Sequence, residues 1–142
     1  MKSNVVFSSS SDEWTTPKEL FESLNNEFIF TLDPCSTEKN HLCERYYTKE
    51  QDGLSKKWGG AVFCNPPYSQ IAKWVKKAYE EALQGTTVVL LVPARTDTRW
   101  FHEYIYNKHE IRFIKGRLHF SGSKQAAPFP SMVVIMKGKQ NV

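Results

Sequence analysis

The chain has 142 residues, of which 40% are hydrophobic and 24% are charged, and its formal net charge is +4. This composition predicts one globular domain with its own core and leaves no room for a separate target-recognition domain. No run of residues is apolar and long enough for a signal peptide or a membrane span. The small excess of Lys and Arg over Asp and Glu, 19 against 15, permits a nucleic-acid partner without requiring one.

The chain contains three cysteines, Cys35, Cys43 and Cys64, without a Cys-x-x-Cys pair. An odd number of unpaired cysteines indicates free thiols in a reducing cytoplasm rather than a disulfide framework. Cys35, His41 and Cys43 are close in sequence, but no second ligand pair completes a zinc site. We therefore expect no metal.

The serine-rich residues 1–13 are expected to be a flexible lead-in to a single domain spanning 14–142. The first helix is predicted to begin at Thr16. Thr16 would cap it, Pro17 would take the first helical position, and Glu19 would complete a capping box. Three residues would form its apolar face: Leu20, Phe21 and Leu24.

A strand over 28–32 should follow this helix, and the polar stretch 36–58 should be irregular. The apolar run 61–64 predicts a second strand. After it comes the clearest helical pattern in the chain, which Ser69 would cap and Gly85 would end.

The β-branched, almost wholly apolar run 86–92 is typical of a strand covered on both faces. A further helix is predicted over 98–107, and closing strands over 110–114, 118–120 and 132–136. The alternation of strands and helices predicts a three-layer α/β domain.

Three residues, Asp33, Asn65 and Pro93, each come just after a predicted strand. In open α/β sheets, ligands bind beyond the carboxyl ends of the strands. We therefore expect these residues to share one edge of the sheet.

The tetrapeptide Asn65-Pro66-Pro67-Tyr68 has the composition of a site that methylates an amino group. An exocyclic amine is a poor nucleophile, so such a site needs acceptors for its N–H groups and a flat surface for its ring. The Asn65 side chain and the Pro66 carbonyl can accept, Pro66 and Pro67 restrict the backbone, and Tyr68 can stack. The same residues also suit a simple turn, with Tyr68 packed on the next helix.

Several separated motifs together make the chain resemble the phage-type DNA N6-adenine methyltransferases, a compact branch of the S-adenosylmethionine-dependent amino-methyltransferases. The resemblance runs from about Trp14 to Lys137. The motifs are Trp14-Thr15-Thr16-Pro17, Leu32-Asp33-Pro34-Cys35, Asp52-Gly53-Leu54 with Trp58, Asn65–Tyr68, Gly116-Arg117-Leu118 and Pro128-Phe129-Pro130-Ser131.

The resemblance implies a Rossmann-like methyltransferase fold, a three-layer sandwich in compact, trimmed form with a mixed sheet. It implies transfer of a methyl group from S-adenosylmethionine to N6 of adenine in DNA by a phage or prophage enzyme. The expected location is the cytoplasm of the host cell. The expected partner is DNA, with no membrane and no obligatory protein partner.

The resemblance also implies cofactor roles for five residues. Thr16 and Pro17 would help to enclose the methionine end of the cofactor. Asp33, followed by Pro34, would hold the cofactor ammonium, although Asp-Pro is also a turn. Asp52 would accept a hydrogen bond from the cofactor adenine, and the turn formed by Asp-Gly is the alternative.

One departure from the family pattern concerns the loop after Asp33. Related enzymes carry a glycine-rich loop there, whereas residues 34–40 contain no glycine. The acidic residue that grips the ribose is either Glu38 or Glu44, between which the sequence does not decide. The short gap between Asp33 and Asn65 indicates that a strand and a helix have been trimmed.

In this family the target adenine leaves the helical stack, so Tyr68 would stack on the extruded base. Phe120 or Phe129 would form the second wall of the base pocket, although either could be a core residue. Six basic residues would suit phosphates or form an ordinary solvated face: Arg95, Arg99, Arg112, Lys115, Arg117 and Lys124. Arg117, within its family-like motif, is the foremost of these.

Two other functions remain open at this point. One is the same chemistry on RNA or on a protein glutamine. The other is a DNA-binding relic that has kept the fold and lost the cofactor, which the glycine-free loop favours. A nucleophilic role for Cys35, as in cytosine-C5 methyltransferases, would leave Asn65–Tyr68 unexplained, so we assign Cys35 to packing.

Overall fold

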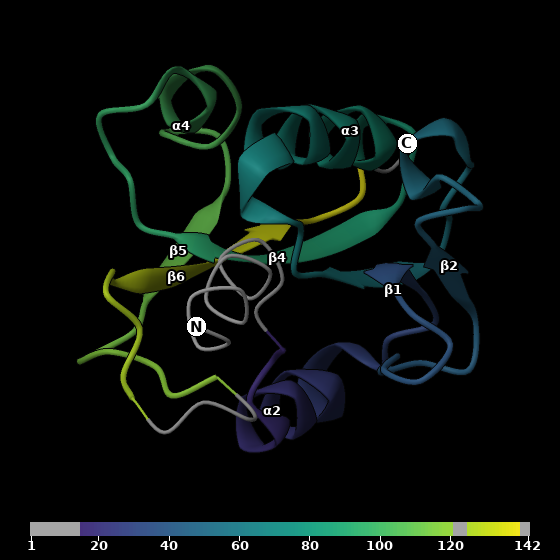
Figure 1. Cartoon of the computed structure of the whole chain (residues 1–142). Coiled ribbons are helices and arrows are strands. Elements are labelled where there is room, and N and C mark those ends of the chain that lie inside the picture. The colour runs from purple at the N-terminus through teal and green to yellow at the C-terminus, as the bar shows by residue number, and fades with distance from the viewer. Residues whose placement is uncertain (1–14, 121–124, 140–142) are drawn as a thin grey trace.

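The computed structural model describes residues 15–120 and 125–139, which form a mixed α/β fold around a mixed sheet (Figure 1). The helices are α2 (Lys18–Phe28), α3 (Ile71–Leu83) and α4 (Arg99–Tyr104), with short 3-10 turns η1 (Gly53–Ser55) and η2 (Tyr68–Gln70). The strands are β1 (Asp33–Ser36), β2 (Tyr46–Thr48), β3 (Ala61–Cys64), β4 (Thr87–Pro93), β5 (Glu110–Phe113) and β6 (Ser131–Met136).

The main sheet has four strands in the order β3-β4-β6-β5, with β3 and β4 parallel and the other neighbours antiparallel. Strands β1 and β2 form a separate parallel pair. Leu32 bridges Val62 in parallel, and the Phe63 N–H donates to the Leu32 carbonyl at 3.1 Å, so the chain entering β1 runs beside β3. The carboxyl ends of β3 and β4 therefore share one edge of the sheet with the start of β1.

Strand β4 is covered on both faces, as its sequence predicts. Val88, Leu90 and Val92 belong to one apolar cluster, which includes residues of α3 and α4. Val89 and Leu91 belong to a second cluster, which includes residues of α2. Figure 1 shows α3 and α4 on one side of the sheet and α2 on the other. Burial of each such aliphatic side chain stabilises the fold by about 1.5–3 kcal/mol, so this strand anchors the edge that carries the site.

The long periodic elements are confirmed. Helix α3 buries most of its apolar positions, although Leu83 near its end is 51% exposed. Strands β4, β5 and β6 lie within about a residue of their expected bounds. The helix over 98–107 is shorter than expected. Thr98 caps it by accepting the Phe101 N–H at 3.3 Å.

The predicted strand over 28–32 is wrong in position, because α2 continues through Phe28 and β1 starts at Asp33, which was expected to follow the strand. Ile29 then adopts a left-handed conformation with φ 55°, and its N–H donates to the Asn25 carbonyl. The Asn25 side chain accepts the N–H of Phe30 at 2.8 Å. These bonds satisfy the helix end locally and override the β-propensity of the Phe-Ile-Phe run.

Both predicted N-terminal caps are also wrong. Helix α2 begins after Pro17, and the Thr16 hydroxyl accepts a hydrogen bond from Asn65 instead. Ser69 lies inside η2, and α3 begins after Gln70 without a side-chain cap bond from that residue.

Two further differences lie in the connecting segments. The stretch 36–58 contains β2 and η1. Residues 118–120 form no strand, because their partner is a loop: the Ala127 N–H donates to the Leu118 carbonyl at 2.7 Å. The expected lead-in 1–13, together with Trp14 and Lys124, lies outside the described residues.

Candidate active site at the carboxyl edge of the sheet

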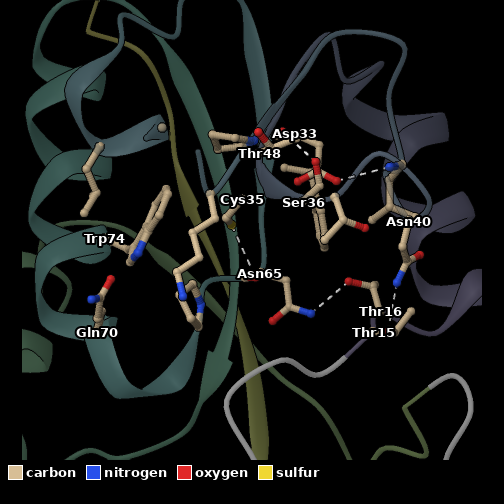
Figure 2. Close-up of a pocket in the computed structure, with 18 of the residues that line it drawn as sticks. Thr15, Thr16, Asp33, Cys35, Ser36, Asn40, Thr48, Asn65, Gln70 and Trp74 are labelled. Atoms are coloured by element: carbon tan, nitrogen blue, oxygen red, sulfur yellow. Dashed lines mark hydrogen bonds between the residues drawn. The ribbon is translucent and has the colours of Figure 1, made fainter. Parts of the chain in front are cut away.

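A cavity of about 220 Å³ opens at the carboxyl edge of β3, between β1, η1, α3 and the segment before α2 (Figure 2). Its lining includes six of the residues expected at a catalytic or cofactor site: Thr16, Asp33, Pro34, Asp52, Asn65 and Pro67. Pro17, Pro66 and Tyr68 adjoin these residues in the chain but do not line the cavity. The structure thus brings segments 15–17, 33–35, 52–54 and 65–68 together around one space.

Asp33 provides a carboxylate on the cavity wall and is only 4% exposed. Its Oδ2 accepts the Leu42 N–H at 3.1 Å. Burial raises the pKa of Asp33 from its ordinary value of 3.8 to about 6, although the N–H groups of Leu42 and Cys35 and the nearby His41 act in the opposite direction. A buried carboxylate of this kind suits a cationic ligand, whose charge would offset the cost of burial.

Asn65 is held through both its side chain and its backbone. Its Nδ2 donates to the Thr16 hydroxyl at 3.0 Å, and its carbonyl accepts from the Cys35 thiol at 3.3 Å. The Cys35 sulfur also lies 3.6 Å from that of Cys64. Burial, reinforced by the Cys64 thiol, raises the pKa of Cys35 well above its ordinary value, so the thiol keeps its proton. Cys35 is therefore a hydrogen-bond donor to Asn65 in addition to a packing residue.

The aromatic residue beside Tyr68 is Phe129. Their ring centroids are 5.3 Å apart in an edge-to-face arrangement. The Ala94 N–H donates to the Pro130 carbonyl at 2.9 Å, which brings the Pro-Phe-Pro-Ser motif to the end of β4. Phe120, at 2% exposure, is buried in the core cluster that contains α2 residues. Of the two expected walls of a base pocket, only Phe129 lies directly against Tyr68.

Gly53 is a site residue that the sequence reasoning missed. A Cβ at this position would collide with the Pro34 carbonyl oxygen and lie 3.1 Å from the Trp74 ring. The absence of a side chain at Gly53 thus lets η1 lie directly against the backbone of β1. The signal was the Asp52-Gly53 pair, in which only Asp52 was expected to contact the cofactor, with a turn as the alternative. Asp52 is exposed at the cavity rim with φ 57°.

Other polar residues of the cavity also escaped the sequence reasoning. They are Thr15, Ser36, Thr37, Asn40, Thr48, Lys49 and Gln70. Asn40 Nδ2 donates to the Thr15 hydroxyl at 3.1 Å, which ties the loop after β1 to the segment before α2. Glu38 and Glu44, the two candidates for a ribose contact, are exposed and do not line this cavity.

The expected basic face is only partly available for phosphates. Arg112 contacts both oxygens of the Glu27 carboxylate at 2.7 Å and Glu110 at 2.7 Å, so its charge is already paired within the protein. The Arg99 charge pairs with Glu103 at 3.1 Å.

The other two arginines of this set are exposed. Arg117 donates to the Ala127 carbonyl at 3.4 Å. Arg95 follows β4, and its charge opposes the rise that burial causes in the pKa of Tyr68. The charge of Arg95 therefore acts directly on Tyr68, at the end of the Asn65–Tyr68 segment.

Two negative findings apply to the residues that the structure describes. Among residues 15–120 and 125–139, no group of three or more His, Cys, Asp or Glu side chains is arranged to hold a metal ion. Within the same ranges, no helix has the length and apolar character needed to cross a membrane.

Comparison with known proteins matches this chain to one family. The family model described as DNA N-6-adenine-methyltransferase (Dam) matches residues 2–141. A DNA N-6-adenine-methyltransferase of Haemophilus phage HP1 is 32% identical over 148 residues, which cover 97% of this chain and 85% of that protein. A DNA N-6-adenine-methyltransferase of Escherichia phage T1 is 36% identical over 110 residues, which cover 75% of this chain and 46% of the relative. The chain thus spans about half the length of the phage T1 relative. With nearly its whole length matched, the chain belongs to the DNA N-6-adenine-methyltransferase (Dam) family.

Proposed function

We propose that this chain transfers a methyl group from S-adenosylmethionine to the N6 amino group of adenine in DNA, as a phage or prophage enzyme acting in the host cytoplasm. The observation that carries the proposal is the position of Asn65–Tyr68 at the edge of a cavity whose wall contains the buried carboxylate of Asp33. The mixed sheet with helices on each face fits a compact Rossmann-like methyltransferase sandwich, to which we assign the fold.

The cavity suits the cofactor chemically. S-adenosylmethionine supplies an electrophilic methyl group on a sulfonium, and it also carries an ammonium. Asp33 would hold that ammonium, because the pairing removes the cost of an isolated buried charge. Thr16 and Pro34 on the cavity wall, with Pro17 next to Thr16 in the chain, would surround the methionine part. Asp52 at the cavity rim would accept from the adenine amino group.

The acceptors for the target amine are the Asn65 side-chain oxygen and the Pro66 carbonyl. The Asn65 backbone carbonyl already accepts from the Cys35 thiol, so the next peptide oxygen is the nearest backbone acceptor in the chain. Proline at both 66 and 67 restricts the backbone that directs this oxygen. As N6 becomes positive during methyl transfer, both hydrogen bonds strengthen, so they stabilise the transition state more than the ground state.

The base would be extruded from the duplex and stack on Tyr68. Phe129 contacts Tyr68 edge to face, so it would have to shift to become the second wall of the base pocket. Arg95 and Arg117 would contact DNA phosphates near this opening. Arg112 has no part in this surface.

The test is transfer of a labelled methyl group to unmethylated DNA, RNA and protein, combined with calorimetric titration of S-adenosylmethionine. Asn65→Ala and Tyr68→Ala should each lower transfer to DNA by about 10²-fold or more, while cofactor affinity stays within a few-fold of the parent. Asn26→Ala is the matched control, because Asn26 is exposed on α2 and should keep the parental rate.

The other outcomes discriminate between the remaining functions. Parental rates in both variants would refute the assignment of the base pocket. Transfer to RNA or protein in preference to DNA would show that the substrate is RNA or protein and not DNA. Failure to bind S-adenosylmethionine, with and without DNA, would indicate the cofactor-less relic.

A further inference from the structure

We infer that Thr16 is a positioning residue for methyl transfer, whose hydroxyl sets the orientation of the Asn65 amide. The inference rests on the proposed function, because it concerns how Asn65 presents its oxygen to the target amine. Sequence reasoning placed Thr16 as a helix cap and a cofactor contact. The hydrogen bond to Asn65 adds a different role.

The contact joins residues that are 49 positions apart in the chain, at an Nδ2–Oγ1 distance of 3.0 Å. Thr16 is 4% exposed, so its hydroxyl lies in a largely dry environment where a hydrogen bond is directional and hard to replace by water. In Figure 2 the Asn65 side-chain oxygen points away from Thr16 while the amide nitrogen faces it. Thr16 lies outside α2, which begins after Pro17 and has no side-chain cap bond.

The orientation matters because the two ends of an asparagine amide have the same shape and opposite hydrogen-bonding character. A rotation of half a turn would put the NH₂ group where an acceptor must meet the N–H of the target amine. Two donors would then face each other, and the catalytic hydrogen bond would be lost. An oxygen at the position of Thr16 Oγ1 favours the productive orientation, since Nδ2 donates to it.

Further hydrogen bonds hold both partners of the Thr16–Asn65 contact in place. The Cys35 thiol holds the Asn65 backbone carbonyl at 3.3 Å. Thr15, next to Thr16, is tied to the loop after β1 by Asn40 at 3.1 Å. The segment that carries the Thr16 hydroxyl is therefore anchored independently of Asn65. Such preorganisation of an acceptor before the substrate binds is what a transition-state contact requires.

Thr16→Val tests the inference, because valine keeps the shape of threonine and removes the hydroxyl. We expect kcat for DNA methylation to fall about 5- to 30-fold, with the Kd for S-adenosylmethionine within about twofold of the parent. Thr16→Ser, which retains the hydroxyl, should recover most of the rate. In an Asn65→Ala background, Thr16→Val should have little further effect on kcat, because the two residues act as one unit.

Thr31→Val is the matched control. The Thr31 hydroxyl donates to the Ala61 carbonyl at 3.1 Å, and Thr31 does not line the cavity. This variant loses a hydroxyl contact of similar length and should keep the parental kcat.

The outcomes separate failure of this inference from failure of the proposed function. If the parent transfers no methyl group to DNA, the proposed function fails. If the parent is active and Thr16→Val keeps the parental kcat, or loses only cofactor affinity, Thr16 is not a positioning residue. If Thr16→Val shows no cooperative thermal unfolding, Thr16→Ala and Thr16→Ser are compared by the same two measurements, and equal kcat values overturn the inference.

Discussion

Replacement of Asp33 by asparagine should make the protein more stable at neutral pH while it weakens the cofactor. The change of the Asp33 pKa from 3.8 to about 6 corresponds to about 3 kcal/mol, at about 1.4 kcal/mol per pH unit. This is the free-energy cost of ionising Asp33 in the folded, ligand-free protein relative to the unfolded chain. Asparagine removes that cost and keeps an oxygen that can accept the Leu42 N–H.

The sign of the pH dependence follows from the raised pKa. Between pH 3.8 and about 6 the unfolded chain has lost the Asp33 proton while the folded chain still holds it. The contribution of this group to stability therefore declines as pH rises through that window and is constant above it. The advantage of Asp33→Asn over the parent should grow by up to about 3 kcal/mol between pH 4 and pH 8.

Urea unfolding of both proteins at pH 4, 6 and 8, without cofactor, measures this difference. The other carboxylates cancel in the comparison, so the pH dependence belongs to Asp33. If the difference in the free energy of unfolding between the two proteins does not change with pH, or shifts in favour of the parent toward pH 8, then the Asp33 pKa is not raised in the folded protein. In calorimetry, Asp33→Asn should bind S-adenosylmethionine at least tenfold more weakly, because a neutral amide does not pair with the ammonium. If the affinity for S-adenosylmethionine is unchanged, Asp33 does not bind the cofactor.

Two further predictions concern the cavity wall and the basic surface. Gly53→Ala should lower the free energy of unfolding by about 1–3 kcal/mol and weaken cofactor binding, because its Cβ would collide with the Pro34 carbonyl. Gly59→Ala, whose Cβ would meet nothing within 4 Å, should cost about 1 kcal/mol for its positive φ and leave cofactor affinity unchanged in the same urea and calorimetric assays. Arg112→Ala should leave DNA affinity unchanged, since two carboxylates already bind its guanidinium. Arg95→Ala should weaken binding and reduce the salt slope by about one, and equal anisotropy titrations for both variants would contradict this distinction.

The extent to which the fold was predictable follows from the length of each pattern. Helix α3 and strand β4 carry many apolar residues at one period, so local sequence determined their type and their buried faces. The run 28–32 is short, and a helix end stabilised by Asn25 decided its conformation. The conformation of this short run depends on the residues that cap and cover it, which its own pattern does not contain.

The same distinction applies to the site. From its sequence alone, the chain could be assigned to its family, and Asn65–Tyr68 and Asp33 could be placed at the carboxyl edge of one sheet. Only the tertiary structure paired Thr16 with Asn65, placed Gly53 against Pro34, and paired Arg112 with Glu27. The reason is physical: the order of the elements along the chain and the position of each motif after a strand can be read from the sequence, whereas these contacts join segments far apart in the chain. Such contacts exist only after the core has brought those segments together.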